Sequence, residues 1–422
     1  LGRPIHRRVT TLGTGLDGSV RRVSTAYLSR GMVDTVTQYD NAAVGSGSAT
    51  DQVKYTYDGW GNMTAFDQDV DGVIGAGGRA AFGVQYAWDV LTPSGGASVL
   101  ARTMMTMPDG TELDYVYDGT VNEPLSRVSA LKYGPYDVPV ASYEYLGAGH
   151  LVKTVLEEPA VSTAAYDAGG TPRDYAYLDR FGRVLRSRWE GGVELCDTTL
   201  TYDRNSNIAT SVDGVFVSAA SKRLHDALYT IDSLNRLTNT LEGHLSGGAI
   251  SGSDDTREEK WTGLTQTGNW ERYKLDLNAD GDFTDTGERD DTGTFNKVNE
   301  WLTRDLDSNA TVDRYLSHDA NGNLTTLSNG TSGTPLGVTY VYDAFGRLVQ
   351  VKEGFDPLVN YRYNGLGHRI LWQYDVDADS SLEPEERLYL CYDERWRTVA
   401  TYWDDDTDPK EQFVHHAAGQ RG

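Results

Sequence analysis

Hydrophobic and polar residues alternate over many short stretches of this chain, which is the pattern of half-buried β-strands. Residues 338–342 read Val-Thr-Tyr-Val-Tyr, residues 237–241 read Leu-Thr-Asn-Thr-Leu, and residues 185–189 alternate in the same way. The uncharged apolar runs are far shorter than the roughly 18 residues that a membrane-spanning helix needs. The pattern therefore predicts a series of short strands and no membrane span.

One seven-residue unit recurs between these strands. It consists of an aromatic residue, Asp or Asn, two variable residues, Gly, a polar residue and an apolar residue. The clearest copies are residues 57–63, 318–324, 342–348 and 363–369, and looser copies are residues 178–184, 202–208, 231–237 and 392–398. Adjacent copies are 21 to 29 residues apart. A unit that returns this often at related spacing predicts a repeat architecture.

The chemistry of this unit is that of a β-hairpin. Asp at its second position matches a type I turn, in which the carboxylate accepts hydrogen bonds from its own turn backbone. Gly supplies the positive φ that a turn followed by a bulge requires before the next strand. One such unit is a common turn and means little, but the series predicts successive hairpins in an antiparallel sheet.

Composition agrees with an all-β protein and limits its partners. Of 422 residues, 46 are Gly and 26 are Tyr, whereas 9 are Phe, which favours turns and pleated surfaces. The formal net charge is −24, so nucleic acid and anionic membranes are disfavoured as partners. The two cysteines are too few for a disulfide framework.

Both ends of the sequence fall within the repeat unit. Residues 1–5, Leu-Gly-Arg-Pro-Ile, match the second half of a copy, and residues 415–420 read as a degenerate copy. No basic and apolar leader follows residue 1. These features favour an internal stretch of a longer repeat protein.

The units resemble those of the Rhs/YD-repeat family, most strongly over residues 170–250 and 315–405. The resemblance implies a long antiparallel β-sheet of hairpins that spirals into a hollow shell. Members of that family include bacterial toxin-delivery proteins, whose shells enclose a toxic C-terminal polypeptide, and animal cell-adhesion proteins. The family's core-ending segment with its self-cleaving aspartates has no match before Gly422, and no toxin domain is present. Autoproteolysis and toxicity are therefore not carried over.

The repeat pattern divides the chain into four regions. Residues 1–165 carry degenerate repeats, residues 166–245 carry YD repeats, residues 246–312 form an insertion, and residues 313–422 carry the C-terminal YD repeats. The first, third and last regions each contain an acidic segment. These three segments hold much of the acidic excess.

Acidic residues or Asn stand at every second position in these segments. The candidate metal ligands are Asp67, Asp69 and Asp71 in the first segment; Asp276, Asn278, Asp280, Asp282 and Glu288 in the second; and Asp375, Asp377, Asp379 and Glu386 in the third. This is the beginning of a calcium loop of EF-hand type, with oxygen ligands at positions 1, 3 and 5. Glu386 falls at position 12, where a bidentate carboxylate belongs, whereas Glu288 is one place late.

The acidic segments are flanked by strand-like residues rather than helices, so they predict calcium-binding hairpin loops and not true EF-hands. A solvated acidic turn remains the alternative, because Asp, Asn and Gly are turn formers in any case. The first segment has no acid near position 12 and is the weakest candidate. Affinity would be of the weak extracellular kind, with dissociation constants of about 10⁻⁴–10⁻³ M.

These features lead to one main hypothesis and two alternatives. The main hypothesis is a non-enzymatic shell or scaffold segment of a large bacterial Rhs/YD-repeat protein, secreted or at the cell surface, with calcium in its loops. Its partners would be flanking segments of the same polypeptide or an enclosed C-terminal polypeptide. The first alternative is an adhesin module that binds surface carbohydrate through exposed Trp and Tyr. The second is a hydrolase, for which no motif singles out a catalytic pair.

Overall fold

The computed structural model describes residues 2–75, 81–93, 96, 98–118, 121–147, 149–166, 175–215, 225–250, 255–329, 337–375, 381–404 and 406–415. The chain divides into two compact units. Unit 1 consists of Leu1–Val140, His318–Leu327 and Pro335–Gly422, and unit 2 consists of Ala141–Ser317 and Ser328–Thr334.

Strands account for nearly all of the regular structure. The N-terminal strands are β1 (His6–Arg8), β2 (Arg22–Tyr27), β3 (Val33–Tyr39), β4 (Ala49–Tyr57), β5 (Met63–Asp69), β6 (Ala81–Leu91), β7 (Val99–Thr106), β8 (Glu112–Val116) and β9 (Ala130–Tyr133). The middle strands are β10 (Val138–Leu146), β11 (His150–Leu156), β12 (Val161–Ala164), β13 (Arg186–Glu190), β14 (Glu194–Tyr202), β15 (Ile208–Asp213), β16 (Asp226–Ile231), β17 (Leu237–Gly243), β18 (Asp255–Thr262), β19 (Arg272–Asp276), β20 (Arg289–Phe295), β21 (Trp301–Asp305), β22 (Arg314–His318) and β23 (Leu324–Asn329). The C-terminal strands are β24 (Gly337–Tyr342), β25 (Leu348–Glu353), β26 (Asp356–Tyr363), β27 (Arg369–Tyr374), β28 (Arg387–Tyr392), β29 (Thr398–Trp403) and β30 (Glu411–Gln412).

Each strand pairs with the next strand along the chain. Antiparallel pairing joins consecutive strands from β1 to β9, from β10 to β22 and from β24 to β30. Within the described residues there is no α-helix, and the 3₁₀-helix η3 (Pro384–Glu386) lies between β27 and β28. The prediction of an all-β antiparallel hairpin repeat is confirmed.

The turn between β24 and β25 shows why the repeat unit has its sequence. The main-chain N–H of Asp343 donates to the carbonyl of Arg347 (2.9 Å), and that of Gly346 donates to the carbonyl of Asp343 (3.0 Å). Asp343 Oδ1 accepts from the main-chain N–H groups of Phe345 (2.8 Å) and Arg347 (3.0 Å). Gly346 has a φ of 77°, and the strand register shifts just before the turn. The predicted turn with a bulge is therefore confirmed.

The same network recurs at the other copies. In every copy that has Asp at its second position, the Asp Oδ2 accepts from the side chain four residues on, which is Asn or Arg. The pairs are Asp58–Asn62, Asp179–Arg183, Asp203–Asn207, Asp232–Arg236, Asp319–Asn323, Asp343–Arg347 and Asp393–Arg397. Hydrogen bonds from Asn207 hold the pKa of Asp203 below its usual value. The polar residue after Gly is therefore part of the turn.

That polar residue also reaches the next turn along the chain. Arg347 Nη1 donates to the carbonyl of Asn364 (3.0 Å), and Arg236 Nη1 donates to the carbonyl of Thr265 (2.6 Å). Arg183 Nη1 lies 3.0 Å from a Ser206 hydroxyl that belongs to the following turn. Consecutive hairpins are thus joined by side chains as well as by strand pairing.

The aromatic residue at the start of the unit makes the reverse connection. The Tyr202 hydroxyl donates to the carbonyl of Val184 (2.7 Å), just after the preceding turn, and the guanidinium of Arg183 lies 4.5 Å from the centre of the Tyr202 ring. The Tyr392 hydroxyl likewise donates to the carbonyl of Arg369 (2.6 Å). At these repeats, Tyr therefore contacts the preceding repeat, and Arg contacts the following turn.

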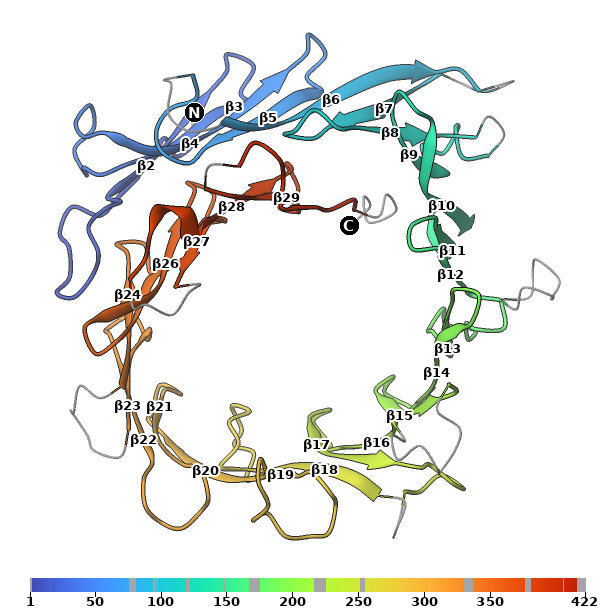
Figure 1. Cartoon of the computed structure of the whole chain (residues 1–422), viewed down its shortest axis with the longest axis vertical. Coiled ribbons are helices and arrows are strands. Elements are labelled where there is room, and N and C mark those ends of the chain that lie inside the picture. Colours follow the sequence, from blue (N-terminus) through green and yellow to red (C-terminus); the bar gives the residue numbers. More distant parts are fainter. Residues whose placement is uncertain are drawn as a thin grey trace. The chain divides into compact units, whose positions relative to one another are not determined.

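Unit 1 has two layers, because the C-terminal strands β24–β29 lie beside the N-terminal strands β2–β6 (Figure 1). Three successive YD turns contact the N-terminal layer through the backbone of their aromatic residues. Asp17 N–H donates to the carbonyl of Tyr342 (2.8 Å), and Gln38 Nε2 donates to the carbonyl of Tyr363 (2.5 Å). The N–H of Tyr392 donates to Gln68 Oε1 (3.3 Å).

Apolar side chains fill the space between these layers. The Phe82 ring lies 5.0 Å from that of Tyr402 and 6.0 Å from that of Tyr389. A side chain at Gly365 would meet Val36 Cγ1 at 2.6 Å, which shows how closely this turn approaches β3. Burial of such surface is the main favourable contribution to folding.

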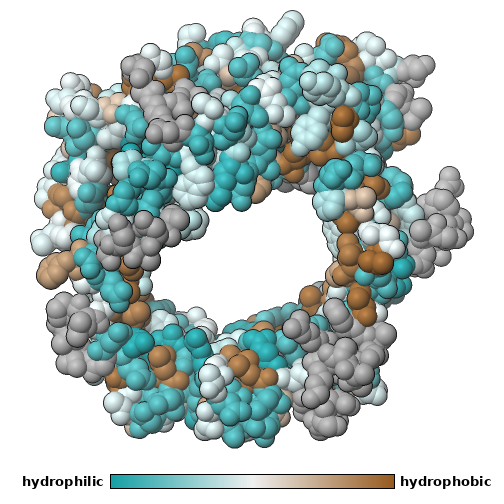
Figure 2. Space-filling model, in the orientation of Figure 1, coloured by the Kyte–Doolittle hydropathy of each residue, from teal (hydrophilic) through white to brown (hydrophobic). Residues whose placement is uncertain are grey.

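Unit 2 has little fully buried apolar surface. Among its described residues, the fully buried apolar side chains are Ala141, Tyr143, Val152, Tyr177, Ala227 and Ile250. Ion pairs join neighbouring strands instead, including Arg186–Asp197, Arg257–Glu242, Arg272–Asp290 and Arg304–Asp291. On the face shown in Figure 2, apolar residues are scattered among hydrophilic ones.

Candidate metal-binding loops

The second acidic segment forms a wound loop between β19 and β20. It begins at Asp276, which is fully buried at the end of β19. Asp276 Oδ1 accepts from the N–H of Asn278 (3.2 Å), and its Oδ2 accepts from the N–H of Gly281 (2.9 Å). Gly281 has a φ of 90°, as position 6 of a calcium loop requires. The loop therefore turns tightly around its first carboxylate.

The side-chain oxygens of the next two predicted ligands make the same kind of contact, each with the main-chain N–H two residues later. Asn278 Oδ1 accepts from the N–H of Asp280, and Asp280 Oδ1 accepts from the N–H of Asp282, both at 3.0 Å. Glu288 closes the loop, because its two oxygens accept from the N–H groups of Leu277 and Asp285, each at 3.0 Å. The structure thus gathers the predicted residues of this segment in one loop, and calcium binding there stays a prediction.

The first acidic segment is not a loop over its first residues. Asp67 and Asp69 lie within β5, so the interpretation of this part as a loop was wrong. The strand continues here because Phe66, Gln68 and Val70, which alternate with the acids, are buried within unit 1. Burial raises the pKa of Asp67, while Lys54 opposes the shift, and Asp71 is ion-paired with Arg362 at 2.5 Å. Metal binding by these three acids stays a prediction.

The third acidic segment lies between β27 and β28, which confirms that strands flank it. Asp377 and Asp379 lie outside the described residues. Glu386 is buried and ends η3, where its Oε2 accepts from the N–H of Glu383 at 3.0 Å. Asp375 lies just after β27. The structure therefore does not test whether these four acids meet.

The part of the chain that the structure describes contains one group of three acidic, His or Cys side chains with ligand atoms within 4.8 Å of one another. It consists of Asp305, Asp307 and Asp313, and no predicted ligand belongs to it. The sequence carried a signal, since oxygen-bearing residues alternate from Asp305 through Asn309 to Asp313. This segment has Ala310 at position 6, where the segment that begins at Asp276 has Gly281.

A cavity of about 400 Å³ lies between the two layers of unit 1 and has Asp51, Asp343 and Arg362 in its lining. Burial raises the pKa of Asp51 to about 7, although Gln38 and Arg362 act in the opposite direction. Asp51 Oδ1 accepts from the N–H of Gly365 (3.1 Å), and its Oδ2 accepts from Gln38. Asp51 is therefore a carboxylate with a raised pKa in a cavity, but both of its oxygens take part in layer packing.

Comparison with known proteins identifies the repeat. A model of the RHS repeat matches residues 318–355, which include the turns at Asp319 and Asp343. These residues therefore contain an RHS repeat. No curated protein matches it.

The chain also shares its fold with much longer proteins of known structure. One is a chain of the Photorhabdus luminescens Tc holotoxin pore, with a TM-score of 0.54 and 15% identity over 92% of this chain and 20% of that chain. Another is a TcdB2-TccC3 structure without its hypervariable C-terminal region, with a TM-score of 0.50 and 13% identity over 95% of this chain and 22% of that chain. This chain thus spans about a fifth of those chains. In the described residues, no helix has the length and apolar character to cross a membrane.

Proposed function

We propose that this RHS-repeat chain is a non-enzymatic segment of a structural shell in a larger bacterial polypeptide. The segment encloses or displays other parts of that polypeptide, which are its principal partners. We place the protein outside the cell or at its surface. The similarity to a chain of a Tc holotoxin supports this proposal, since that chain is about five times longer than the matched region.

The observation that carries the proposal is the continuous connection between repeats. Strand pairing, the Arg contact to the following turn and the Tyr contact to the preceding turn all join neighbours along the chain. Such a sheet grows by adding hairpins and exposes edges only at its two ends, which limits edge-to-edge aggregation. A continuous wall is what an enclosing scaffold needs.

Calcium in the acidic loops belongs to this proposal. In the loop between β19 and β20, carboxylate oxygens of Asp276, Asp280 and Glu288 accept hydrogen bonds from the loop backbone, which fixes their side chains within this loop. A hard dication takes six to eight oxygens from such a loop. Binding there would stabilise the folded hairpin relative to the unfolded chain.

The test of enclosure is protease protection in the longest natural polypeptide that contains this chain. Segments outside the repeat region should be cleaved much more slowly in the intact protein than in the same segments expressed alone. A matched variant, Arg347→Ala, removes one contact between neighbouring turns and should accelerate cleavage. Equal cleavage rates for intact and isolated segments would refute enclosure.

A carbohydrate-binding adhesin is the second candidate, and exposed rings at turn tips favour it. Trp60 is 89% exposed and Phe181 is 69% exposed, each two residues after the turn Asp. An exposed ring can stack on an apolar face of a ligand. Specific retention on a glycan array at millimolar calcium, abolished by Trp60→Ala, would support this function over the scaffold.

A further inference from the structure

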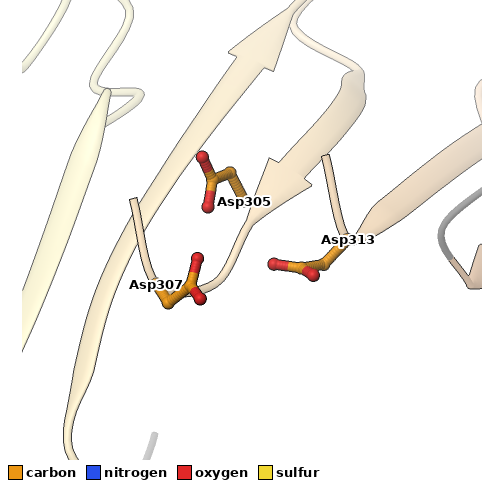
Figure 3. A group of neighbouring side chains, drawn as sticks. All are labelled: Asp305, Asp307 and Asp313. Carbon is orange, nitrogen blue, oxygen red and sulfur yellow. The ribbon is translucent and has the colours of Figure 1, made fainter. Parts of the chain in front are cut away.

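The hairpin between β21 and β22 ends in an acidic loop that none of the predicted metal segments includes. The loop begins at Asp305, the last residue of β21, and closes where the N–H of Asp313 donates to the carbonyl of Arg304 (2.9 Å). Ser308 Oγ donates to the carbonyl of Asp290 on β20 (2.5 Å), which fixes the tip against the neighbouring strand. The three carboxylates of Asp305, Asp307 and Asp313 point toward a common centre (Figure 3).

One oxygen in this group has no hydrogen-bond partner. Asp305 is only 7% exposed, and its Oδ1 accepts no hydrogen bond, whereas its Oδ2 accepts from the N–H of Ala310 (2.8 Å). A buried carboxylate oxygen without a donor is costly, because it has lost water and gained no replacement. Asp305 contributes one of its carboxylate oxygens to a group in which the ligand atoms of Asp305, Asp307 and Asp313 all lie within 4.8 Å of one another.

No protein cation balances these charges among the described residues. Arg304, which precedes Asp305, is ion-paired with Asp291. Arg314 Nη1 donates to the main-chain carbonyl of Asp313 (3.1 Å) rather than to its carboxylate. Like charges this close repel one another and favour either protonation or a bound cation.

We propose that Asp305, Asp307 and Asp313 bind a calcium ion. The donors are all oxygens, as hard cations prefer, and no sulfur or imidazole ligand is present that would favour zinc. Asn309 and Thr311 alternate with the acids and offer further oxygens. A short, partly exposed hairpin loop suits the flexible coordination of calcium better than the strict octahedron of magnesium.

The test counts calcium bound per chain by equilibrium dialysis and calorimetric titration of chelator-treated protein. The variant Asp307→Asn/Asp313→Asn leaves the buried Asp305 in place and should bind one calcium fewer than the wild type. The matched control, Asp280→Asn/Asp282→Asn, removes the same charge from the loop between β19 and β20 and should retain this site. Circular dichroism of all three proteins checks that the sheet is intact.

The outcomes separate this site from the calcium loops of the proposed function. Loss of one equivalent in Asp307→Asn/Asp313→Asn supports the new site, whether or not the control also loses one. Loss only in the control would assign calcium to the second acidic loop and overturn the new site. Equal binding by all three proteins, or no binding at millimolar calcium, would also overturn it. Magnesium at the same concentration should not reproduce the titration.

Discussion

Units 1 and 2 use the same turn but stabilise their strands differently. In unit 1, the strands β4 and β5 bury Val53 and Phe66 almost completely beneath the C-terminal layer. In unit 2, the strands β13–β18 are largely half-buried and joined by ion pairs such as Arg186–Asp197. The comparison indicates that the turn network is sufficient to form a hairpin, whereas a second layer is needed to create a core.

The largest difference should come from removing core volume in unit 1. Phe66→Ala should cost about 3–5 kcal/mol, because a fully buried ring leaves a cavity between the layers. Hydrogen exchange should show loss of protection in β4–β6 while β14–β17 remain protected. Leu241→Ala in half-buried β17 is the matched truncation and should cost much less. Equal costs in both units would contradict the two-layer explanation.

The next effect should come from the polar contacts between the layers. Gln68 Nε2 donates to the carbonyl of Leu390 (2.7 Å), and its Oε1 accepts from Tyr392. Gln68→Ala should cost about 2–3 kcal/mol, because two part-buried main-chain groups lose a partner. Gln85→Ala removes an exposed Gln from the neighbouring strand and should be close to neutral in a denaturant titration.

Titration of Asp51 should make unit 1 pH-sensitive. Its pKa is raised from 3.8 to about 7, so the folded state binds a proton that the unfolded chain has released. The free energy of unfolding should therefore fall as pH rises from about 4 to about 7, by about 2 kcal/mol between pH 5 and pH 7. Asp51→Asn should flatten this part of the profile. Superimposable profiles for the two proteins would show that Asp51 does not titrate as described.

The smallest effect should come from a cross-strand ion pair in unit 2. Arg186 contacts both oxygens of Asp197 at 2.6 Å, and this contact holds the pKa of Asp197 below its usual value. Arg186→Gln should cost about 0.5–1 kcal/mol, since the pair is partly exposed. The cost should shrink in high salt. Arg204→Gln, at an exposed position, is the control, and a salt-independent loss would argue against an electrostatic origin.

The turns could be predicted from sequence because their contacts are local. Asp343 and Arg347 are four residues apart, so one repeat unit contains the whole network. The layer contacts could not be predicted. Gln38 and Tyr363 are 325 residues apart, and no sequence pattern in either segment indicates that the two segments are in contact. Strand pairing of neighbours follows from the repeat, whereas stacking of one layer on another depends on long-range geometry.

The acidic segments show the same difference between local features, which the sequence predicts, and long-range packing, which it does not. The segment that begins at Asp276 formed its predicted wound loop, because Gly281 permits the left-handed backbone locally. The segment at Asp67 stayed in a strand, since burial of its alternate residues outweighed its turn-like composition. The loop at Asp305 was not predicted, although Ala310 adopts the same left-handed backbone there, with a φ of 72°.

The stacking of unit 1 also restricts how its sequence can change in length. The contact positions Asp17, Gln38 and Gln68 are separated by 21 and 30 residues, and the turn residues that they meet, at 342, 363 and 392, are separated by 21 and 29. An insertion within the paired residues of β4 or β5 would therefore move Gln68 away from its partner unless the opposite hairpin lengthened as well. Related sequences should show paired changes in the lengths of hairpins that lie more than three hundred residues apart.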